Sequence, residues 1–233
     1  MNILITGASR GLGKAIAEKF AANGHHLFLS SRSKQALMES VDSIKKKNPT
    51  LRVKYHAADL SDKQQAKQLA EWMLEQQTDI DVLVNNAGSF RPGSVYNEEE
   101  GSLEEMMAVN LYSAYHLTRS LLPAMMQKRK GHIFNLCSIA SLKAYENGGA
   151  YSVSKFALLG FTRNLREEMK TYNIKVTAVI PGAAYTDSWA GSGVDPKRLL
   201  EANDIADLVY AASQLSPQAC VEEIVVRPQL GDL

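Results

Sequence analysis

The stretch "ITGASRGLGKAIAEKF", residues 5–20, joins the end of an apolar run to the start of an amphipathic one. Behind Thr6, the glycines Gly7, Gly11 and Gly13 stand in a T-G-x-x-x-G-x-G array. Glycine lets the backbone turn sharply, approach a ligand closely and pack the next helix tightly on a sheet. The N–H groups at the start of that helix suit a pyrophosphate. The stretch is open to two interpretations, a dinucleotide site or a structural turn, and its position between an N-terminal strand and a helix favours the first.

Apolar runs and amphipathic stretches alternate through the rest of the chain. The runs are rich in β-branched residues, and their nearly continuous apolarity is typical of strands covered on both faces. This repetition predicts an α/β fold, a doubly wound sheet of seven mainly parallel strands flanked by helices on both faces, in a single domain over residues 1–233. The predicted strands are Ile3–Thr6, His26–Ser31, Val53–Ala57, Val82–Asn85, His132–Cys137, Val176–Ile180 and Glu223–Val226. The predicted helices are Gly11–Ala22, Lys34–Lys47, Lys63–Glu75, Leu103–Lys128, Tyr151–Tyr172 and Asn203–Gln214.

The composition argues against several classes of protein. Of the 233 residues, 45% are hydrophobic, and a formal net charge of +1 gives no bulk attraction to nucleic acid or anionic lipid. No apolar run approaches the roughly 20 residues of a membrane span, and the N-terminus lacks the pattern of a secretory signal. Cys137 and Cys220 form no spaced framework, and no His, Cys and carboxylate residues have metal-ligand spacing. We therefore expect a cytoplasmic protein with no metal, no nucleic-acid partner and no membrane contact, in which Cys137 packs inside a strand.

The end of the second predicted strand bears on the choice of cofactor. Folds that prefer NAD tend to place a carboxylate there for the ribose hydroxyls. This chain reads "LFLSSRS" over residues 27–33, with Ser31 and Arg32 and no acid. An arginine holds a 2′-phosphate by paired, charge-assisted hydrogen bonds, and Arg10 in the glycine loop is a second candidate cation. The pattern favours NADP(H) over NAD(H); the alternative is that Arg32 is a solvated residue at a helix entry.

Three residues form the candidate catalytic group. In "GAYSVSKFALLGF", residues 149–161, Tyr151 and Lys155 lie four positions apart and so share one helical face. A nearby ammonium is expected to lower the pKa of the phenol and to make it a proton donor or acceptor. Such a pair is common on helices, but Ser138 ends the strand "HIFNLCS" shortly before it, and catalytic groups collect at the carboxyl ends of strands.

A fourth candidate is an amide in a largely apolar helix. Asn110 lies in "MMAVNLYSAYHL", residues 106–117, where its side chain needs either a catalytic role or a buried polar partner that fixes packing. Asn85 and Asn86 end the preceding predicted strand in "NNAG", and Pro181 and Gly182 end a later one in "AVIPGAAYTD".

Taken together, these motifs resemble the classical short-chain dehydrogenase/reductase family. The resemblance rests on "TGASRGLG", "NNAG", Asn110, Ser138, "YSVSK" and "PGAAYT", in that order, and extends from Asn2 to about Arg227. It implies a Rossmann-like sheet and NAD(P)-dependent oxidoreductase activity on CH–OH or C=O groups. Within the family the chain is similar to NADP-preferring carbonyl reductases, including those of 3-oxoacyl and pterin substrates.

The resemblance also implies a role for each motif residue. The expected cofactor-binding residues around the diphosphate and adenosine are Gly7, Ser9, Arg10, Leu12 and Gly13, with Ser31 and Arg32 at the 2′-phosphate, Asp59 facing the adenine, and Asn86, Ala87 and Gly88 on the adenosine-ribose side. Pro181, Gly182 and Thr186 would hold the nicotinamide end. Tyr151 would transfer the proton, Ser138 would bind the substrate oxygen, Lys155 would hold the nicotinamide ribose, and Asn110 would position a water. For Asp59 the alternative is a cap for the helix that follows.

The leading hypothesis is an NADPH-dependent reductase that transfers a hydride to a small-molecule carbonyl substrate. The alternatives are an NAD(P)-dependent alcohol or hydroxy-acid dehydrogenase working oxidatively, and a non-catalytic dinucleotide-sensing protein. The segment Ala183–Leu200 is expected to cover the substrate as a short lid, with Trp189 either walling an apolar substrate or anchoring the loop. The resemblance further implies a homodimer or homotetramer assembled through the long helices Leu103–Lys128 and Tyr151–Tyr172.

Overall fold

The computed structural model describes residues 1–186 and 193–232. Its sheet has seven strands in the order β3-β2-β1-β4-β5-β6-β7, and every neighbouring pair is parallel. The strands are β1 (Asn2–Thr6), β2 (His26–Ser31), β3 (Val53–Ala57), β4 (Val82–Asn85), β5 (Gly131–Leu136), β6 (Ile174–Pro181) and β7 (Glu223–Val226). This confirms the predicted fold class, with strand ends shifted by one or two residues in β1, β5 and β6.

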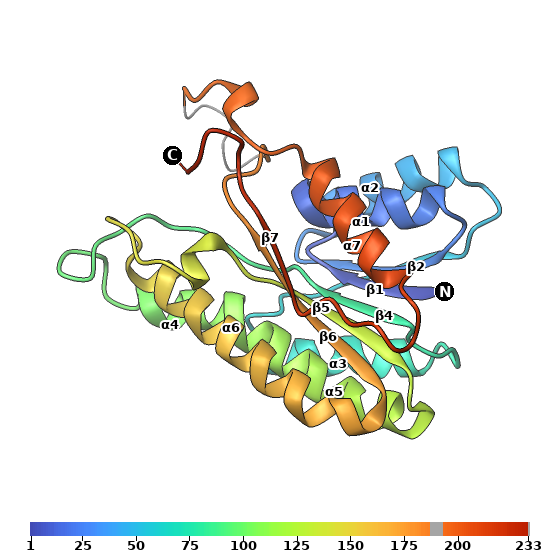
Figure 1. Ribbon diagram of the computed structural model, residues 1–233. Coiled ribbons are helices and arrows are strands. Elements are labelled where there is room, and N and C mark those ends of the chain that lie inside the picture. The colour runs from blue at the N-terminus through green and yellow to red at the C-terminus, as the bar shows by residue number, and fades with distance from the viewer. Residues whose placement is uncertain (187–192, 233) are drawn as a thin grey trace.

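Helices cover both faces of the sheet (Figure 1). They are α1 (Gly11–Ala22), α2 (Lys34–Lys47), α3 (Lys63–Leu74), α4 (Ser102–Met107), α5 (Ser113–Lys128), α6 (Gly149–Met169) and α7 (Ala202–Ser213). In Figure 1, α1, α2 and α7 lie on one side, and α3, α4, α5 and α6 lie on the other. Each side has its own cluster of buried apolar residues, one around Phe20 and Leu29 and the other around Phe28 and Leu69.

Two helix starts show how local sequence sets the boundaries. The hydroxyl of Ser33 accepts a hydrogen bond from the N–H of Ala36 at the start of α2. The Asp62 carboxylate accepts one from Gln64 at 2.7 Å at the start of α3. Such caps satisfy N–H groups that have no partner within the helix.

One predicted helix is interrupted. The segment expected as a single helix over Leu103–Lys128 consists of α4, a π-helical turn at Ala108–Tyr112 and α5. Periodicity alone did not indicate the inserted π-turn, which carries Asn110 at its centre. Such π-turns are frequent at functional sites.

The strand order determines where a ligand fits. The chain passes from β1 outward to β2 and β3, then returns to the other side of β1 with β4. Between the carboxyl ends of β1 and β4 the connections diverge, and in doubly wound sheets this switch point opens a crevice. Thr6, the last residue of β1, and Asn85, the last of β4, mark that crevice.

Candidate active site

The glycine loop lies in this crevice at the end of β1. Gly7 and Gly11 have positive φ angles of 63° and 52°, in a region that side-chain-bearing residues rarely adopt. In α1, no acidic residue lies in the first turn and no N-cap side chain occupies the N–H groups of this fully described helix. The first turn of α1 therefore carries no carboxylate of its own and offers N–H donors to an anion, which fits the diphosphate of a dinucleotide.

Asn86 and Thr6 hold this loop in place. The Asn86 side-chain amide donates to the carbonyl oxygens of Thr6 at 2.9 Å and Gly7 at 3.1 Å. In return, the Thr6 hydroxyl accepts hydrogen bonds from the N–H groups of Asn86 and Ala87. The side chain of Asn86 thus fixes the shape of the glycine loop. From the sequence, Thr6 was predicted only to end a strand.

Gly13 is packed so closely against the loop that a side chain has no room there. A Cβ atom there would lie 2.4 Å from both the Gly7 carbonyl oxygen and the Asn86 amide nitrogen. Because one of these contacts is with backbone, Gly13→Ala must displace α1 or the loop, and we expect a loss of roughly 1–3 kcal/mol in the free energy of unfolding. Denaturant titration measures the loss. Gly24→Ala serves as a contrast, because a Cβ there meets nothing within 4 Å and only its positive φ of 79° adds strain. A Gly13→Ala variant as stable as the wild type would contradict this packing.

The residues expected around the adenosine follow β2 and β3. Ser31 is buried, and its hydroxyl donates to the carbonyl oxygen of Ser33 at 3.2 Å. Arg32 is exposed. Asp59 accepts hydrogen bonds from the N–H and hydroxyl of Ser61 through one carboxylate oxygen. Asp59 therefore stabilises a turn, whereas Asp62 caps α3, so the proposed capping role belongs to the second aspartate. The contact of Asp59 with adenine stays a prediction.

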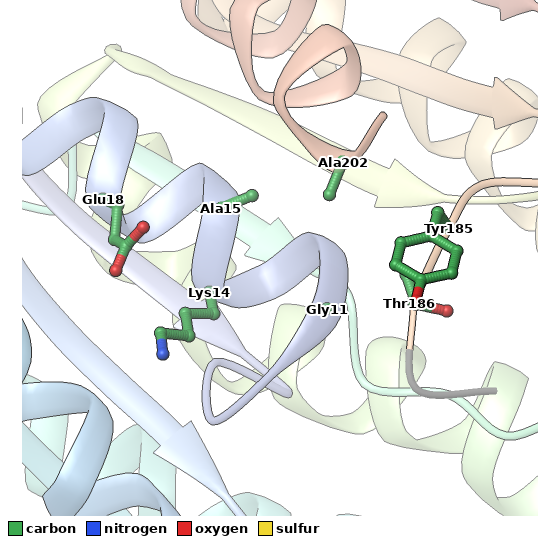
Figure 2. A pocket seen from close by; sticks show the side chains of 7 residues that line it. All are labelled: Gly11, Lys14, Ala15, Glu18, Tyr185, Thr186 and Ala202. Carbon is green, nitrogen blue, oxygen red and sulfur yellow. The ribbon is translucent and has the colours of Figure 1, made fainter. Parts of the chain in front are cut away.

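The end of β6 brings Pro181, Gly182 and Thr186 to the same edge of the sheet. The N–H of Gly182 donates to the carbonyl oxygen of Val226, and a Cβ at Gly182 would lie 2.9 Å from Pro228. Thr186 lies over Gly11, whose Cβ would be 3.3 Å from the threonine methyl group. Figure 2 shows Tyr185 and Thr186 facing the start of α1 across a hollow of about 280 Å³. Of the expected lid, Trp189, Gly191 and Ser192 lie outside the described residues.

Four side chains form the candidate catalytic centre beyond β5. Lys155, 7% exposed, donates from Nζ to the carbonyl oxygen of Leu136 at 2.8 Å, and Nζ lies 5.8 Å from the centre of the Tyr151 ring. The Ser138 side chain lies close enough to the Tyr151 phenol to lower its pKa, and the Ser138 hydroxyl accepts a hydrogen bond from the N–H of Ala140. Ser138 lies two residues past the end of β5 as the N-cap of a short 3-10 helix. Tyr151 and Lys155 are thus on one face of α6, as predicted.

Asn110 is buried next to this group. Its side chain accepts from the N–H of Ser89 at 2.8 Å and donates to the Ser89 carbonyl oxygen and to the Ser154 hydroxyl at 2.9 Å. A Cβ at Gly88 would lie 3.0 Å from the Asn110 amide oxygen and 3.6 Å from Lys155 Nζ. The structure therefore brings Gly88, Asn110 and Lys155 together. It also shows the buried amide that the sequence left as an alternative, since Asn110 ties the segment after β4 to α6.

The expected direction of the Tyr151 pKa is wrong. Burial raises the pKa of the Tyr151 phenol, and this effect exceeds the lowering by the nearby Ser138 side chain. Desolvation also lowers the pKa of Lys155 to about 8. The ammonium that was expected to favour the phenolate therefore loses its charge at a lower pH than an ordinary lysine. In this structure Tyr151 is therefore held in the protonated form, the form of a proton donor.

Cys137 behaves as core. It lies one residue beyond β5 rather than inside the strand, it is 3% exposed, and burial raises the pKa of its thiol to about 11. Such a thiol is unreactive at neutral pH. Among residues 1–186 and 193–232, no group of three or more His, Cys, Asp or Glu side chains is placed to hold a metal ion. None of the helices in the described parts of the chain is long and apolar enough to cross a membrane.

Comparison with known proteins identifies the family. A model of the short chain dehydrogenase family matches residues 1–196. The chain belongs to the short-chain dehydrogenase family. Members of this family are NAD(P)-dependent oxidoreductases, so the chain is an enzyme of that class. The four residues at the end of β5 and on α6 and the π-turn are the ones that the family resemblance singles out.

Relatives of this short-chain dehydrogenase match it over nearly its whole length. It is 35% identical to a sepiapterin reductase of Chlorobaculum tepidum, over 99% of this chain and 97% of the relative. A metagenomic short-chain oxidoreductase solved in complex with NADP has 31% identity and a TM-score of 0.86, over 98% of this chain and 97% of that one. An alcohol dehydrogenase of Thermococcus sibiricus, solved with 5-hydroxy-NADP, has 28% identity and a TM-score of 0.90, over 98% and 96%.

Proposed function

We propose that this short-chain dehydrogenase is an NADPH-dependent reductase of a small-molecule carbonyl substrate. The observation that carries the proposal is the arrangement of the partly buried Tyr151, with Ser138 near its phenol and Lys155 Nζ 5.8 Å from its ring centre, at the sheet edge where the glycine loop opens. A phenol kept neutral by burial is suited to donating a proton. The direction of the pKa shift therefore favours reduction.

The residues of the chain would divide the chemistry among them. The glycine loop and the ends of β2 and β6 would hold NADPH, and the chemistry that this cofactor would supply is a hydride for the carbonyl carbon. As the C=O bond becomes CH–OH, the Tyr151 hydroxyl gives its proton to the substrate oxygen. The Ser138 hydroxyl donates a hydrogen bond to the same oxygen, where negative charge develops. Lys155 stays fixed by its hydrogen bond to the Leu136 carbonyl oxygen, and Asn110 holds the segment after β4 against α6.

The preference for NADP(H) rests on the end of β2. Arg32 is exposed beside the buried Ser31, and the sequence "LFLSSRS" has no carboxylate to repel a 2′-phosphate. The relatives support the same choice, since the metagenomic enzyme was solved with NADP. An L-sorbose reductase of Gluconobacter frateurii, 27% identical, was solved with NADPH and L-sorbose.

Replacement of Arg32 tests this preference. We expect the wild type to bind NADPH at least about tenfold tighter than NADH, and Arg32→Ala to lose about 1.4 kcal/mol or more of that difference, because a charge-assisted hydrogen bond to phosphate disappears. Nicotinamide fluorescence titration measures both constants. Lys46→Ala removes the same charge from the far end of α2 and should leave the ratio unchanged. Equal or tighter binding of NADH by the wild type would refute the proposed preference.

A second candidate is oxidation of an alcohol or hydroxy acid. The observation that favours this second candidate is the similarity to the archaeal alcohol dehydrogenase, with a TM-score of 0.90. Rates measured in both directions separate the two. The non-catalytic, dinucleotide-sensing alternative has lost its basis, because the chain is a member of an oxidoreductase family and holds all four candidate catalytic residues.

For the assembly we propose a homodimer or homotetramer built on the outer faces of the long helices. Half-exposed apolar side chains on the π-turn and α6 support this, among them Tyr112, Val153 and Phe156. Light scattering measures the assembly directly.

A further inference from the structure

A loop between β4 and α4 is fastened to the start of the catalytic helix. The N–H of Gly93 donates to the carbonyl oxygen of Asn147, and the Ser94 hydroxyl donates to the Asn147 side chain at 2.7 Å. The Glu98 carboxylate accepts a hydrogen bond from the N–H of Ala150 at 3.0 Å. Ala150 immediately precedes Tyr151, so this loop, residues 89–101, has a defined position relative to the catalytic phenol.

Gly149 allows the close approach. It has a positive φ of 34°, and a Cβ there would lie 2.4 Å from the Gly93 carbonyl oxygen and 2.6 Å from the Glu98 carboxylate. A side chain at this position would push the loop away from α6. The two segments, separated by about fifty residues in sequence, are therefore packed backbone to backbone.

Phe90 uses this placement to reach Tyr151. The two rings lie edge to face, with centroids 4.9 Å apart and an interplanar angle of 84°. Phe90 nevertheless keeps 52% of its surface exposed. A large apolar side chain that touches the catalytic residue and still faces solvent offers area to whatever binds there.

Tyr145 adds a second aromatic group on the other segment. It is 44% exposed, and its phenol interacts electrostatically with that of Tyr151: burial first, and then Tyr151, raise the pKa of Tyr145 to about 12. Its hydroxyl is thus uncharged across the physiological range. We use the name aromatic wall for Phe90, on the loop, and the half-exposed Tyr145, two residues before the Asn147 that hydrogen bonds with this loop.

The charges of loop 89–101 are paired or negative, whereas the segment that carries Tyr145 has one exposed cation, Lys143. Arg91 is the one basic residue of loop 89–101, and it is paired with Glu105 at 2.9 Å and Glu99 at 3.8 Å. Glu98 adds a further carboxylate, directed at α6. A cation already held by two carboxylates is poorly suited to receive the carboxylate of a hydroxy acid or an oxo acid.

We propose that Phe90 determines substrate specificity, and that the aromatic wall selects uncharged carbonyl compounds with a flat, conjugated ring beside the C=O group. A flat ring packs against the exposed face of Phe90 in an offset or edge arrangement while its carbonyl oxygen lies at Tyr151 and Ser138. A saturated ring of the same size lacks this interaction. The inference rests on the proposed reductase function and narrows its substrate class.

Two substrates of matched shape test the proposal. Phenylpropanedione and cyclohexylpropanedione differ in whether the ring is flat and conjugated, and kcat/KM with NADPH is measured for both. We expect the wild type to prefer the phenyl compound. Phe90→Leu, which keeps apolar volume without a ring, should lower kcat/KM for the phenyl compound roughly two- to tenfold and leave the cyclohexyl compound nearly unchanged. Phe90→Tyr, which keeps an aromatic ring at this position, should keep the wild-type preference for the phenyl compound.

A control in the same loop is Tyr96→Leu. Tyr96 is 87% exposed, and its replacement should leave kcat/KM unchanged for both the phenyl and the cyclohexyl compound. Equal effects of Phe90→Leu on both substrates, or no effect, would overturn the role of Phe90.

Binding without turnover separates this inference from the proposed function. In a Tyr151→Phe background, which keeps the ring that Phe90 contacts, calorimetry measures the dissociation constants of the two diketones. If the phenyl compound binds more tightly than the cyclohexyl compound and Phe90→Leu abolishes this difference, the result supports the aromatic wall. This holds even if the wild type reduces neither compound. In that case only the reductase proposal fails. If the two compounds have equal dissociation constants both in Tyr151→Phe and in the double variant Tyr151→Phe/Phe90→Leu, only the proposal of the aromatic wall is overturned.

Discussion

Replacing Tyr151 with phenylalanine is expected to lower kcat by about 10²- to 10⁴-fold, because a positioned proton donor contributes rate factors of this size. The substitution removes one hydroxyl and keeps the ring that packs edge to face against Phe90 at 4.9 Å. The fold and the glycine loop are untouched, since the loop is held by Asn86 and Thr6. The dissociation constant for NADPH should therefore stay within about twofold of the wild type.

The control for this experiment is Tyr112→Phe. Tyr112 lies at the end of the π-turn and is 45% exposed, so losing its hydroxyl should leave kcat and cofactor binding unchanged. Single-turnover rates distinguish a slower chemical step from slower product release. A Tyr151→Phe enzyme that retains more than a tenth of the wild-type rate would show that another group delivers the proton.

The pH dependence of reduction follows from the same residue. Since burial raises the pKa of Tyr151, the phenol keeps its proton through neutral pH. The rate of reduction should therefore decline only at alkaline pH, where this proton is lost. In an enzyme where an ammonium lowered this pKa, the decline would begin nearer neutrality. The sequence predicted that second behaviour, and burial reverses it.

The fold was predictable because its signals are local and repeated. Seven apolar runs separated by helix-length amphipathic stretches leave few topologies once crossovers are right-handed. Errors occur where a boundary depends on partners elsewhere in the chain: β6 begins at Ile174 because it pairs with Gly131 of β5, two residues before the apolar run at Val176. The π-turn at Asn110 had no local signal, since its residues continue the helical pattern.

The candidate site divides in the same way. The sequence predicted that Tyr151 and Lys155 share one face of a helix and that Ser138 stands at the end of a strand, and the structure places Ser138 two residues past β5. What they do electrostatically was not predictable, because the pKa of a phenol depends on how much water is removed around it. The hydrogen bond from Ala150 to Glu98 and the contact of Phe90 with Tyr151 join segments that are far apart in sequence. No motif within either segment indicates such a contact.

Lys155→Met is expected to have the second largest effect on turnover, a loss of about 10²-fold or more in kcat/KM. Methionine keeps the length and volume of the side chain but removes the charge and the hydrogen bond to the Leu136 carbonyl oxygen, so the face of α6 that carries Tyr151 loses its fixed cation. Misplacement of a catalytic group by about 1 Å costs rate factors of this order. Lys143→Met, which removes an exposed lysine from the turn before α6, is the matched control.

The same variant has a signature in stability that a change in catalysis alone would not produce. Burial lowers the pKa of Lys155 to about 8 in the folded, cofactor-free protein, below its ordinary value of 10.5. Between these values the unfolded chain binds more protons at this residue than the folded one. The free energy of unfolding of the wild type should therefore rise with pH, relative to Lys155→Met, from about 8 to about 10.5.

The comparison must exclude Cys137, because Cys137 works in the opposite sense. Burial raises the pKa of its thiol from 9.0 to about 11, so the unfolded chain loses this proton first and the contribution of Cys137 to stability falls as pH rises. Cys137 does not cancel in this difference, since Lys155 itself lowers the Cys137 pKa, so both proteins are compared in a Cys137→Ala background that lacks the thiol. Urea titrations with Lys155 and with Lys155→Met in this background, at pH values on either side of 8, measure what remains. Parallel pH profiles would mean that Lys155 keeps its ordinary pKa in the folded protein, and that its ammonium is available to Tyr151 after all.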